Sequence, residues 1–306
     1  MISAIALSPS LDVTYVVDRL AGIQRPHSIH RVPGGKALNA ARAAAALGAP
    51  VSAVAVLGAG VGQDVADGAQ AHGVEVHVVP GTEPTRSCVS IFARDTERLT
   101  EIYERSVPVS ARTASAAVDT AVGLAASRPG WWFVSGGLPD SIPAGLLADA
   151  VRRLHDAGVR VAVDTHGAAL RSAVEAGPDL VKINRAEAQE LVGGDAGTTV
   201  PELLTAVHAL TRGLVVVTDG AAGAWATDGD GVLRARLAGH TGTFPVGSGD
   251  SFLGGLLLVL DGGGDLAAAL ALATATGTAN AQVPGAAVVD PELARRLARE
   301  VEVSAV

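Results

Sequence analysis

A glycine-rich turn lies directly in front of a long apolar run near the C-terminal end of the chain, where residues 244–260 read FPVGSGDSFLGGLLLVL. Capping the following helix requires only one short polar side chain, such as Asp250, so the two glycines that flank Ser248 need another explanation. Backbone N–H groups from Gly247 to Gly249 at the start of a helix form a nest for an anion, and the helix dipole adds partial positive charge. A carboxylate beside that nest is placed to accept a proton from a hydroxyl. These features predict phosphoryl transfer, in which catalysis consists of positioning and charge stabilisation.

Two lysines mark further candidate binding positions. The chain contains only Lys36, in PGGKALN, and Lys182, in VKINRAE, while every other fixed positive charge is an arginine. This bias favours a compact point charge at both positions, although chance placement on the surface is the alternative. Gly34 and Gly35 expose backbone N–H groups at the N-terminus of the following helix. Lys36 and Asn39 face the same opening. The arrangement suits an anionic or polyhydroxylated ligand, unless the turn needs glycine for its geometry alone.

A third candidate site follows the predicted strand DLVKI. Asn184 and Glu187 lie three apart in NRAE and share a face of the first helical turn, so their oxygen atoms can bind Mg²⁺ through water. A helix-start carboxylate favoured by the dipole explains the same residues. Other common motifs are absent: the only GK dipeptide is followed by Ala37, GAGVGQ at 58–63 lacks the third glycine of the dinucleotide fingerprint, and the histidines show no HExxH spacing.

Strands and helices alternate along the chain. Short apolar runs predict strands at 2–7, 51–57, 131–135, 159–164, 179–183 and 214–218. Helical patterns lie between them, at 37–47, 62–72, 143–157, 186–192 and 200–212. Strands that are apolar on both faces and alternate with helices indicate an α/β fold with a mostly parallel central sheet flanked by helices. In such sheets ligands bind outside the carboxyl ends of the strands.

Two segments depart from this rhythm, at about 12–33 and 85–106, where apolar residues alternate with polar or charged ones. Alternation predicts strands with one solvated face. We expect these segments to form a small β-sheet that projects from the body and covers the site as a lid, with 80–84 (PGTEP) as a hinge. No internal repeat or long linker divides the chain, so residues 1–306 are expected to form a single domain.

Composition argues against several classes of function. The formal net charge of −8 disfavours a general nucleic-acid or membrane-surface role, because phosphate groups attract basic faces. The apolar stretches at 254–260 and 266–275 are shorter than the roughly 20 residues of a membrane helix. The start, MISAIALSPSLD, has no basic segment before its apolar run, which favours a first strand over a signal peptide. Cys88 is the only cysteine, so we expect a buried thiol in a cytoplasmic protein.

A series of short motifs, taken in order, resembles the PfkB, or ribokinase-like, carbohydrate kinases over essentially the whole chain. The motifs are SPSLD (8–12), PGGKALN (33–39), TR (85–86), VSGGLP (134–139), VDTHG (163–167), KINRAE (182–187), VTDGAAGA (217–224) and VGSGDSF (246–252). PSLD, TR, SGxLP and DTxG are most similar to the branch that contains 1-phosphofructokinase and tagatose-6-phosphate kinase, whose substrates already carry a phosphate. The resemblance implies a ribokinase-like fold, ATP and Mg²⁺ as cofactors, and a lid that often serves as a homodimer interface.

The resemblance also implies roles for individual residues. Asp250 would be the general base on the acceptor hydroxyl, and the anion hole would be formed by Gly247, Ser248 and Gly249. The sugar would be bound by Asp12, Gly34, Gly35, Lys36, Asn39 and Gly137. Its existing phosphate would be bound by Arg86. Arg25, Arg31 and Arg105 could share that role, unless they form a solvated face of the lid. The ATP phosphates and Mg²⁺ would be contacted by Lys182, Asn184 and Glu187. The nucleotide would be flanked by Thr218, Gly220, Gly223 and Asn280.

Several positions depart from the pattern of the family, namely Ser8, Ala37, Gly137, His166, Ile183 and Ser248. Asp250 and both flanking glycines are retained, which supports kinase chemistry. Gly137 and His166 fall where this branch lines its sugar pocket or close to it. These two residues leave the identity of the sugar undetermined. The family has serine at both positions, and the loss of a serine hydroxyl removes a hydrogen bond that discriminates among the hydroxyl patterns of sugars.

We therefore expect an ATP-dependent phosphotransferase with an alcohol group as acceptor, acting on a phosphorylated ketohexose. Fructose 1-phosphate is the first candidate acceptor. Tagatose 6-phosphate, fructose 6-phosphate, an unphosphorylated sugar and a nucleoside are the alternatives within the family. A sugar-sensing protein without turnover is a third class of function.

Overall fold

The computed structural model describes residues 1–306 as two β-sheets and the helices around them. The larger sheet has ten strands in the order β14-β13-β12-β11-β10-β9-β8-β1-β4-β5. Its parallel part consists of β5 (Val74–Pro80), β4 (Val51–Leu57), β1 (Ile2–Ala6), β8 (Trp131–Ser135), β9 (Arg160–Asp164), β10 (Leu180–Asn184) and β11 (Leu214–Thr218). Its antiparallel end consists of β12 (Ala224–Thr227), β13 (Val232–Arg236) and β14 (Glu302–Ala305). Because the parallel strands all end at one edge, that edge is the expected place for a ligand.

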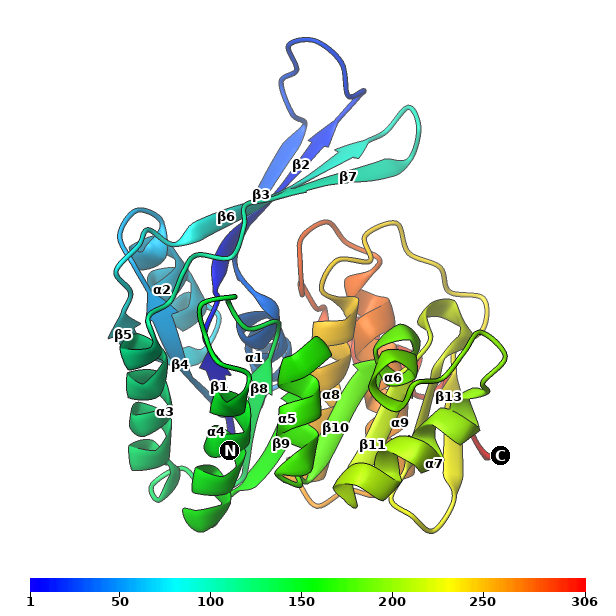
Figure 1. Ribbon diagram of the computed structural model, residues 1–306. Helices are drawn as coiled ribbons and strands as arrows, with labels where there is room; N and C mark the ends of the chain where they lie inside the picture. The colour runs from blue at the N-terminus through cyan, green and yellow to red at the C-terminus, as the bar shows by residue number, and fades with distance from the viewer.

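Helices cover both faces of the larger sheet (Figure 1). One face packs against α1 (Lys36–Ala46), α2 (Gly62–Ala71), α8 (Ser248–Asp261) and α9 (Leu266–Asn280), with α10 (Pro291–Ala298) against α9. The other face packs against α3 (Ala111–Ala125), α4 (Gly145–Asp156), α5 (Gly167–Glu175), α6 (Arg185–Val192) and α7 (Val200–Thr211). This is the predicted α/β fold, with a mostly parallel sheet flanked by helices.

Gly254 allows α8 to pack closely on α1. A Cβ atom at this position would lie 2.6 Å from the carbonyl oxygen of Ala40, a separation that side chains do not reach. The small side chains of Ala40 and Ala44 on α1 are buried in the same contact region. The N-terminal turns of the two helices therefore meet at the carboxyl edge of the sheet, which brings Asn39 next to the turn before α8.

The two segments with alternating polarity form the second sheet, which projects from the body (Figure 1). Its strands are β3 (Ser28–Gly34), β2 (Ser10–Val17), β6 (Arg86–Ala93) and β7 (Arg98–Tyr103), in that order. The central pair β2 and β6 is parallel, and both outer pairs are antiparallel. Asp12, Cys88 and Tyr103 are neighbours across β2, β6 and β7, so they share one face of this sheet.

The predicted strands of the parallel sheet and the five predicted helices are all present, with ends that differ by at most two residues. Helices α3, α5 and α10 and strands β5, β12, β13 and β14 were not predicted from the sequence. The apolar stretches at 254–260 and 266–275 lie within α8 and α9. Cys88 is a buried free thiol, as expected. No helix combines the length and hydropathy that crossing a bilayer would require.

Candidate active site

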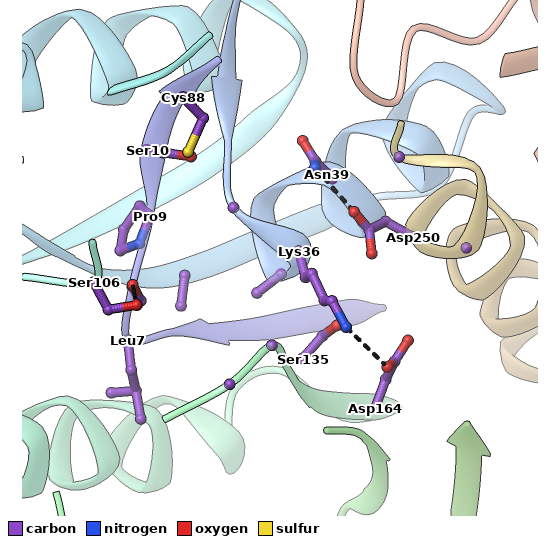
Figure 2. Close-up of a pocket in the computed structure, with 18 of the residues that line it drawn as sticks. Leu7, Pro9, Ser10, Lys36, Asn39, Cys88, Ser106, Ser135, Asp164 and Asp250 are labelled. Atoms are coloured by element: carbon purple, nitrogen blue, oxygen red, sulfur yellow. Dashed lines mark hydrogen bonds and ion pairs between the residues drawn. The ribbon is translucent and has the colours of Figure 1, made fainter. Parts of the chain in front are cut away.

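A cavity of about 720 Å³ lies between the carboxyl edge of the larger sheet and the small sheet. Its lining comes from residues at or just after the ends of β1, β8, β9, β10 and β11, from the first turns of α1 and α8, and from β2, β6 and β7. Figure 2 shows Lys36, Asn39, Asp164 and Asp250 within it. The predicted site residues that line it are Asp12, Gly35, Lys36, Asn39, Arg86, Gly137, Lys182, Asn184, Glu187, Thr218, Gly247, Gly249 and Asp250.

The carboxylate of Asp250 is oriented by α1. Asn39 Nδ2 donates a hydrogen bond of 2.9 Å to Asp250 Oδ2 (Figure 2). Arg42 Nη2 donates one of 2.9 Å to Asn39 Oδ1, and Arg42 also donates to the carbonyl oxygens of Pro33 at 2.8 Å and Ala286 at 2.7 Å. Because a guanidinium group only donates, it fixes the amide of Asn39 with its NH₂ toward the carboxylate. The position of Asp250 thus depends on a buried series of hydrogen bonds.

The environment of Asp250 makes it a suitable proton acceptor. Burial, together with the nearby charge of Asp164, raises the pKa of Asp250 to about 6. The hydrogen bond from Asn39 and the charges of Lys182 and Lys36 act in the opposite direction. A carboxylate with a pKa just below neutral is ionised at pH 7 and can still take up a proton, as general-base catalysis requires.

Asp164, at the end of β9, lies between the two lysines. Lys182 Nζ donates a hydrogen bond of 2.7 Å to Asp164 Oδ2, and Lys36 Nζ lies 4.0 Å from Asp164 Oδ1. Burial acts to lower the pKa of Lys36, but neighbouring carboxylates outweigh it and raise this pKa. These carboxylates belong to Asp164, Asp250 and Glu187. Lys36 therefore remains a cation inside the cavity, where it can attract an anionic group.

Close neighbours explain both glycines of the turn before α8. Gly247 has a φ of +81°, and a Cβ atom there would lie 2.3 Å from the backbone nitrogen of Ala287. A Cβ atom at Gly249 would lie 3.3 Å from Lys182 Nζ. The first glycine allows the left-handed turn, and the second allows the ammonium group to approach the N-terminus of α8.

The N–H groups of this turn differ from one another. The N–H of Ser248 donates to the carbonyl oxygen of Pro245 at 3.0 Å, so it is not free for a ligand. The N–H groups of Gly247, Gly249 and Asp250 have no acceptor within the protein. Three free donors at the start of a helix can bind an anion, although the set is not the predicted run from 247 to 249.

Asn184 and Glu187 form a capping box at the start of α6. Asn184 Oδ1 accepts from the N–H of Glu187 at 2.9 Å, and Glu187 Oε2 accepts from the N–H of Asn184 at 2.8 Å. Both side chains also line the cavity, so capping and ligand binding are compatible. This oxygen-only donor set fits Mg²⁺, which shares its coordination with water and substrate phosphate oxygens.

Asp12 enters the cavity from β2 of the small sheet. Ser10 Oγ donates to Asp12 Oδ1 at 2.6 Å, and burial raises the pKa of Asp12. Gly34 lies directly against this carboxyl group, because a Cβ atom there would lie 2.1 Å from Asp12 Cγ. Gly35 has a φ of +88° and lies against the carbonyl oxygen of Ser8. Gly34 therefore provides space for Asp12 rather than lining the cavity itself.

Arg86 lies at the end of the cavity beneath the small sheet. Its Nη1 donates to the carbonyl oxygen of Glu104 at 3.2 Å and its Nη2 to that of Ser8 at 3.3 Å, while its buried Nε has no partner. Tyr103 and Glu101 on β7 line the same cavity, and Tyr103 Oη donates to Glu101 Oε1 at 2.5 Å. Each terminal nitrogen carries two hydrogens and uses one of them here, so Arg86 retains free N–H donors on Nη1 and Nη2 for a ligand.

Three other predicted residues lie away from the cavity. Arg105 is exposed beyond the end of β7 and does not line it. Gly220 and Gly223 lie at the two ends of the short 3₁₀ turn η1 (Gly220–Ala222), and neither reaches the cavity, whereas Thr218 before them does. The structure therefore brings only the first residue of this predicted nucleotide segment to the cavity.

Asn280 is placed differently from its prediction. It is 0 % exposed, and its Nδ2 donates to the carbonyl oxygen of Val246 at 2.9 Å and to Ser248 Oγ at 2.9 Å. Its Oδ1 accepts from the N–H of Val288 at 3.1 Å. All of these partners are protein atoms, so Asn280 supports the turn before α8 from beneath instead of lying along a nucleotide.

Sequence reasoning did not assign roles to Asp164, Ser135, Glu101 or Tyr103, all of which line the cavity. A signal for Asp164 was present, because VRVAVD ends in a carboxylate at the carboxyl end of a predicted parallel strand. The alternating pattern of β7 marked a half-solvated strand. It could not indicate which face of that strand borders the cavity.

A buried carboxylate beside free helix-terminal N–H groups and two lysines, at the carboxyl edge of a parallel sheet, defines a phosphotransferase that uses a hydroxyl acceptor. The model of the pfkB family carbohydrate kinases matches residues 4–293, and the chain belongs to this family. It is a sugar kinase, and membership of the family implies ATP as the phosphoryl donor.

Solved structures share the fold. Phosphofructokinase-2 from Escherichia coli in complex with fructose-6-phosphate has a TM-score of 0.88 and 22% identity, and the match covers 97% of this chain and 98% of that one. The Thermotoga maritima protein called a possible 1-phosphofructokinase has a TM-score of 0.87 and 19% identity, and the match covers 100% and 99% of the two chains. At these identities the likeness concerns the fold.

Proposed function

We propose that the protein transfers the γ-phosphoryl group of ATP to a hydroxyl of a phosphorylated ketohexose, with fructose 1-phosphate as the first candidate acceptor. The observation that carries the proposal is the position of Asp250, a buried carboxylate whose pKa is about 6, beside three free N–H groups of its own helix turn. Arg86 supports a phosphorylated acceptor, because its two terminal nitrogens keep free N–H donors in the wall that the small sheet contributes to the cavity.

Asp250 acts as the general base in this mechanism. The acceptor hydroxyl lies against its carboxylate and transfers its proton to Asp250 as the oxygen forms a bond to the γ-phosphorus of ATP. The bond from that phosphorus to the β,γ-bridging oxygen breaks, and ADP leaves. The free N–H groups of Gly247 and Gly249 donate to the phosphoryl oxygens while charge develops on them. Lys36 and Lys182 add positive charge on the same side, because Gly249 leaves room for the second ammonium group.

Asn184 and Glu187 are the residues that would bind Mg²⁺, through water. When bound, Mg²⁺ neutralises charge on the ATP phosphates. Glu187 uses Oε2 for the capping box, so its Oε1 remains available to a coordinated water. Thr218, at the end of β11, lies on the same side of the cavity and would border the nucleotide.

The acceptor side would be formed by the small sheet. Asp12 offers a carboxyl group to sugar hydroxyls, and Gly34 keeps it in place by leaving room for it. Cys88 and Tyr103 complete this wall beside it. A polyhydroxylated ligand fits such a wall, because its hydroxyls can donate and accept.

ATP consumption tests the proposal directly. The protein is assayed with ATP and Mg²⁺ against fructose 1-phosphate, fructose 6-phosphate, tagatose 6-phosphate, the free sugars and nucleosides. We expect turnover with a phosphorylated ketohexose, and Asp250→Asn should abolish it while nucleotide binding stays nearly intact. Unchanged turnover by this variant would exclude Asp250 as the general base. If the protein phosphorylates none of these compounds, the result would favour a sugar-sensing protein.

An unphosphorylated acceptor is the second candidate, and the charge of the cavity favours it. The lining carboxylates, from Asp12, Glu101, Asp140, Asp164, Glu187 and Asp250, outnumber the lining lysines and arginines, from Lys36, Arg86 and Lys182. An excess of carboxylates repels a second anion next to ATP. The same assay separates the two candidates, because this one requires turnover of a free sugar or a nucleoside.

We also propose that the small sheet joins two copies of the chain. Residues that alternate with Asp12, Cys88 and Tyr103 point away from the cavity, and they are mainly apolar: Val13, Tyr15, Ile29, Val89, Ile91 and Ile102. Ile102 is 60 % exposed and Ile29 42 % exposed in the single chain. Exposed apolar side chains gathered on one face indicate a protein interface.

A further inference from the structure

His166 and Gly137 lie against each other at the base of the cavity, just beyond the neighbouring strands β9 and β8. Both residues line the cavity. A Cβ atom at Gly137 would lie 2.8 Å from His166 Cε1 and 3.2 Å from His166 Nε2. No side chain at position 137 is therefore compatible with the observed place of the imidazole.

Hydrogen bonds between the two loops fix this contact. The N–H of Gly136 donates to the carbonyl oxygen of Asp164 at 2.8 Å, and Thr165 Oγ1 donates to the carbonyl oxygen of Gly136 at 2.8 Å. Thr165 is buried, so separating the loops would leave buried polar groups without partners. These bonds hold the two loops together, and they thus keep position 137 beside His166.

The imidazole of His166 has no partner in the protein. Neither ring nitrogen makes a hydrogen bond or an ion pair, and the residue is exposed within the cavity wall. Six other histidines make a hydrogen bond, namely His27, His30, His72, His155, His208 and His240. His77 makes none, but its Nε2 lies 3.2 Å from Glu75 Oε1. A neutral imidazole offers one donor and one acceptor, and at this position both remain available to a ligand.

The ring contacts the acceptor half of the cavity. In the larger sheet β9 lies between β8 and β10, and β11 lies beyond β10. His166 packs against the loop after β8, so it lies on the side opposite Thr218 at the end of β11. A ligand oxygen at His166 therefore belongs to the acceptor and not to the nucleotide, in the arrangement proposed above.

We propose that His166 is an acceptor-specificity residue, whose imidazole forms a hydrogen bond to an oxygen of the acceptor, either a sugar hydroxyl or a phosphate oxygen. Gly137 is required because it leaves the space that the ring occupies. The inference rests on the proposed function, since it takes the acceptor to be a sugar or a sugar phosphate.

Steady-state kinetics of His166→Ala test the role of the ring. We expect kcat/KM for the best acceptor to fall about tenfold, with a changed order of acceptors and a KM for ATP within about twofold of the wild type. Fructose is compared with fructose 1-phosphate, fructose 6-phosphate and tagatose 6-phosphate. A loss confined to the phosphorylated sugars assigns the hydrogen bond to a phosphate oxygen. A loss that extends to fructose and differs between fructose 6-phosphate and tagatose 6-phosphate assigns it to a hydroxyl. A changed KM for ATP with an unchanged order of acceptors would overturn the proposal.

Gly137→Ala and the double variant test the contact between the residues. Gly137→Ala displaces the ring and should cause a loss similar to that of His166→Ala. Added to His166→Ala, it should cost little more, because the ring is already absent. Gly145→Ala is the matched control, since a Cβ atom there meets no other atom within 4 Å. Additive losses would contradict the contact, and thermal melts identify any variant that fails to fold.

The outcomes also separate this inference from the proposed function. An active wild type whose His166 and Gly137 variants keep the same order of acceptors would overturn only the role of His166. A wild type without turnover, and without a thermal shift in fructose 1-phosphate or fructose 6-phosphate, would overturn both.

Discussion

Asn39 and Asp250 lie 211 positions apart in the sequence, yet a buried hydrogen bond of 2.9 Å joins their side chains. The close packing of α8 on α1 at Gly254 makes this contact possible. Arg42 fixes the orientation of the amide from the other side. The amide stabilises the charged form of a carboxylate that burial disfavours, so the pKa of Asp250 reflects a balance between these two effects.

Removing the amide should disturb this balance in a known direction. Asn39→Ala removes a hydrogen bond that lowers the pKa of Asp250, so this pKa should rise above about 6. The base works when it is ionised, and activity therefore appears as the pH rises through its pKa. We expect the acidic limb of the kcat/KM profile to move to higher pH, with a loss of about tenfold at pH 6 and a smaller loss at pH 8.

Asp164→Asn supplies the opposite change. The charge of Asp164 raises the pKa of Asp250, so its removal should move the acidic limb to lower pH. The variant also leaves Lys182 without its carboxylate partner, which should lower kcat at every pH. The measurement is therefore the pH at which the acidic limb of the kcat/KM profile lies, and not the maximal activity of the variant. Limbs that move in the same direction in both variants would contradict the assignment of the base.

The raised pKa of Asp250 also predicts a cost to stability. The pKa is about 6 in the folded state and near 3.8 in an ordinary aspartate, so between these values the folded protein binds more protons. Stability therefore falls as the pH rises through this range, and the penalty is complete above about pH 6. Asp250→Asn removes the charge, and should raise the free energy of unfolding at pH 8 by at most about 3 kcal/mol.

Urea unfolding at pH 8 and pH 4 measures this gain. It should disappear near pH 4, where the wild-type carboxyl group is protonated in the folded state. Asp230→Asn, at an exposed carboxylate, is the control and should change stability little at either pH. An equal gain at both pH values would argue for a cause other than the buried charge.

The fold was predictable to the extent that local patterns determine it. Strands such as Val51–Leu57 are buried along their whole length, and continuous apolar runs marked them clearly. Helix α3, with the sequence ARTASAAVDTAVGLA, escaped prediction because its buried stripe consists mainly of alanine, and small side chains mark a buried face less clearly than large apolar ones. The stripe is formed by Ala114, Ala117, Val118, Ala121 and Ala125. Strand β14 escaped because it is a short edge strand with mostly exposed side chains. Tertiary pairing, rather than local sequence, specifies such elements.

The site was predictable where one turn carries the chemistry, as at Asp250 and its flanking glycines. Contacts between distant segments were not. Arg42 read as one more residue of an alanine-rich helix, and only the fold brings the carbonyl oxygen of Ala286 to its guanidinium. Asn280 matched a family position, but its hydrogen bonds to the turn before α8 depend on how α9 packs. Such roles depend on contacts between side chains that are distant in the sequence, and spacing along the chain does not reveal these contacts.

Arg86 and Arg105 allow a matched test of the acceptor phosphate. Both were candidate phosphate ligands, but only Arg86 lines the cavity. Arg86→Ala should raise the KM for phosphorylated ketohexoses at least tenfold, because charged hydrogen bonds to phosphate are strong, and should leave the KM for a free sugar nearly unchanged. Arg105→Ala should change neither. The role of Arg86 in binding the acceptor phosphate would be contradicted if both substitutions changed the KM for phosphosugars equally, or if Arg86→Ala changed the KM for none of them. Either result would favour an unphosphorylated acceptor.

Ile102 on β7 offers a test of the proposed dimer. Its side chain points away from the cavity and is 60 % exposed in the single chain, so an interface on this face would bury it. Ile102→Glu would place a charge in that interface, and desolvating an unpaired carboxylate costs several kcal/mol. We expect a dimer for the wild type and a monomer for this variant by size-exclusion chromatography with light scattering.

Leu210→Glu, at an exposed apolar residue of α7 outside the small sheet, should remain dimeric. A monomeric wild type, or a dimer that survives Ile102→Glu, would place any association of this chain elsewhere than on the small sheet.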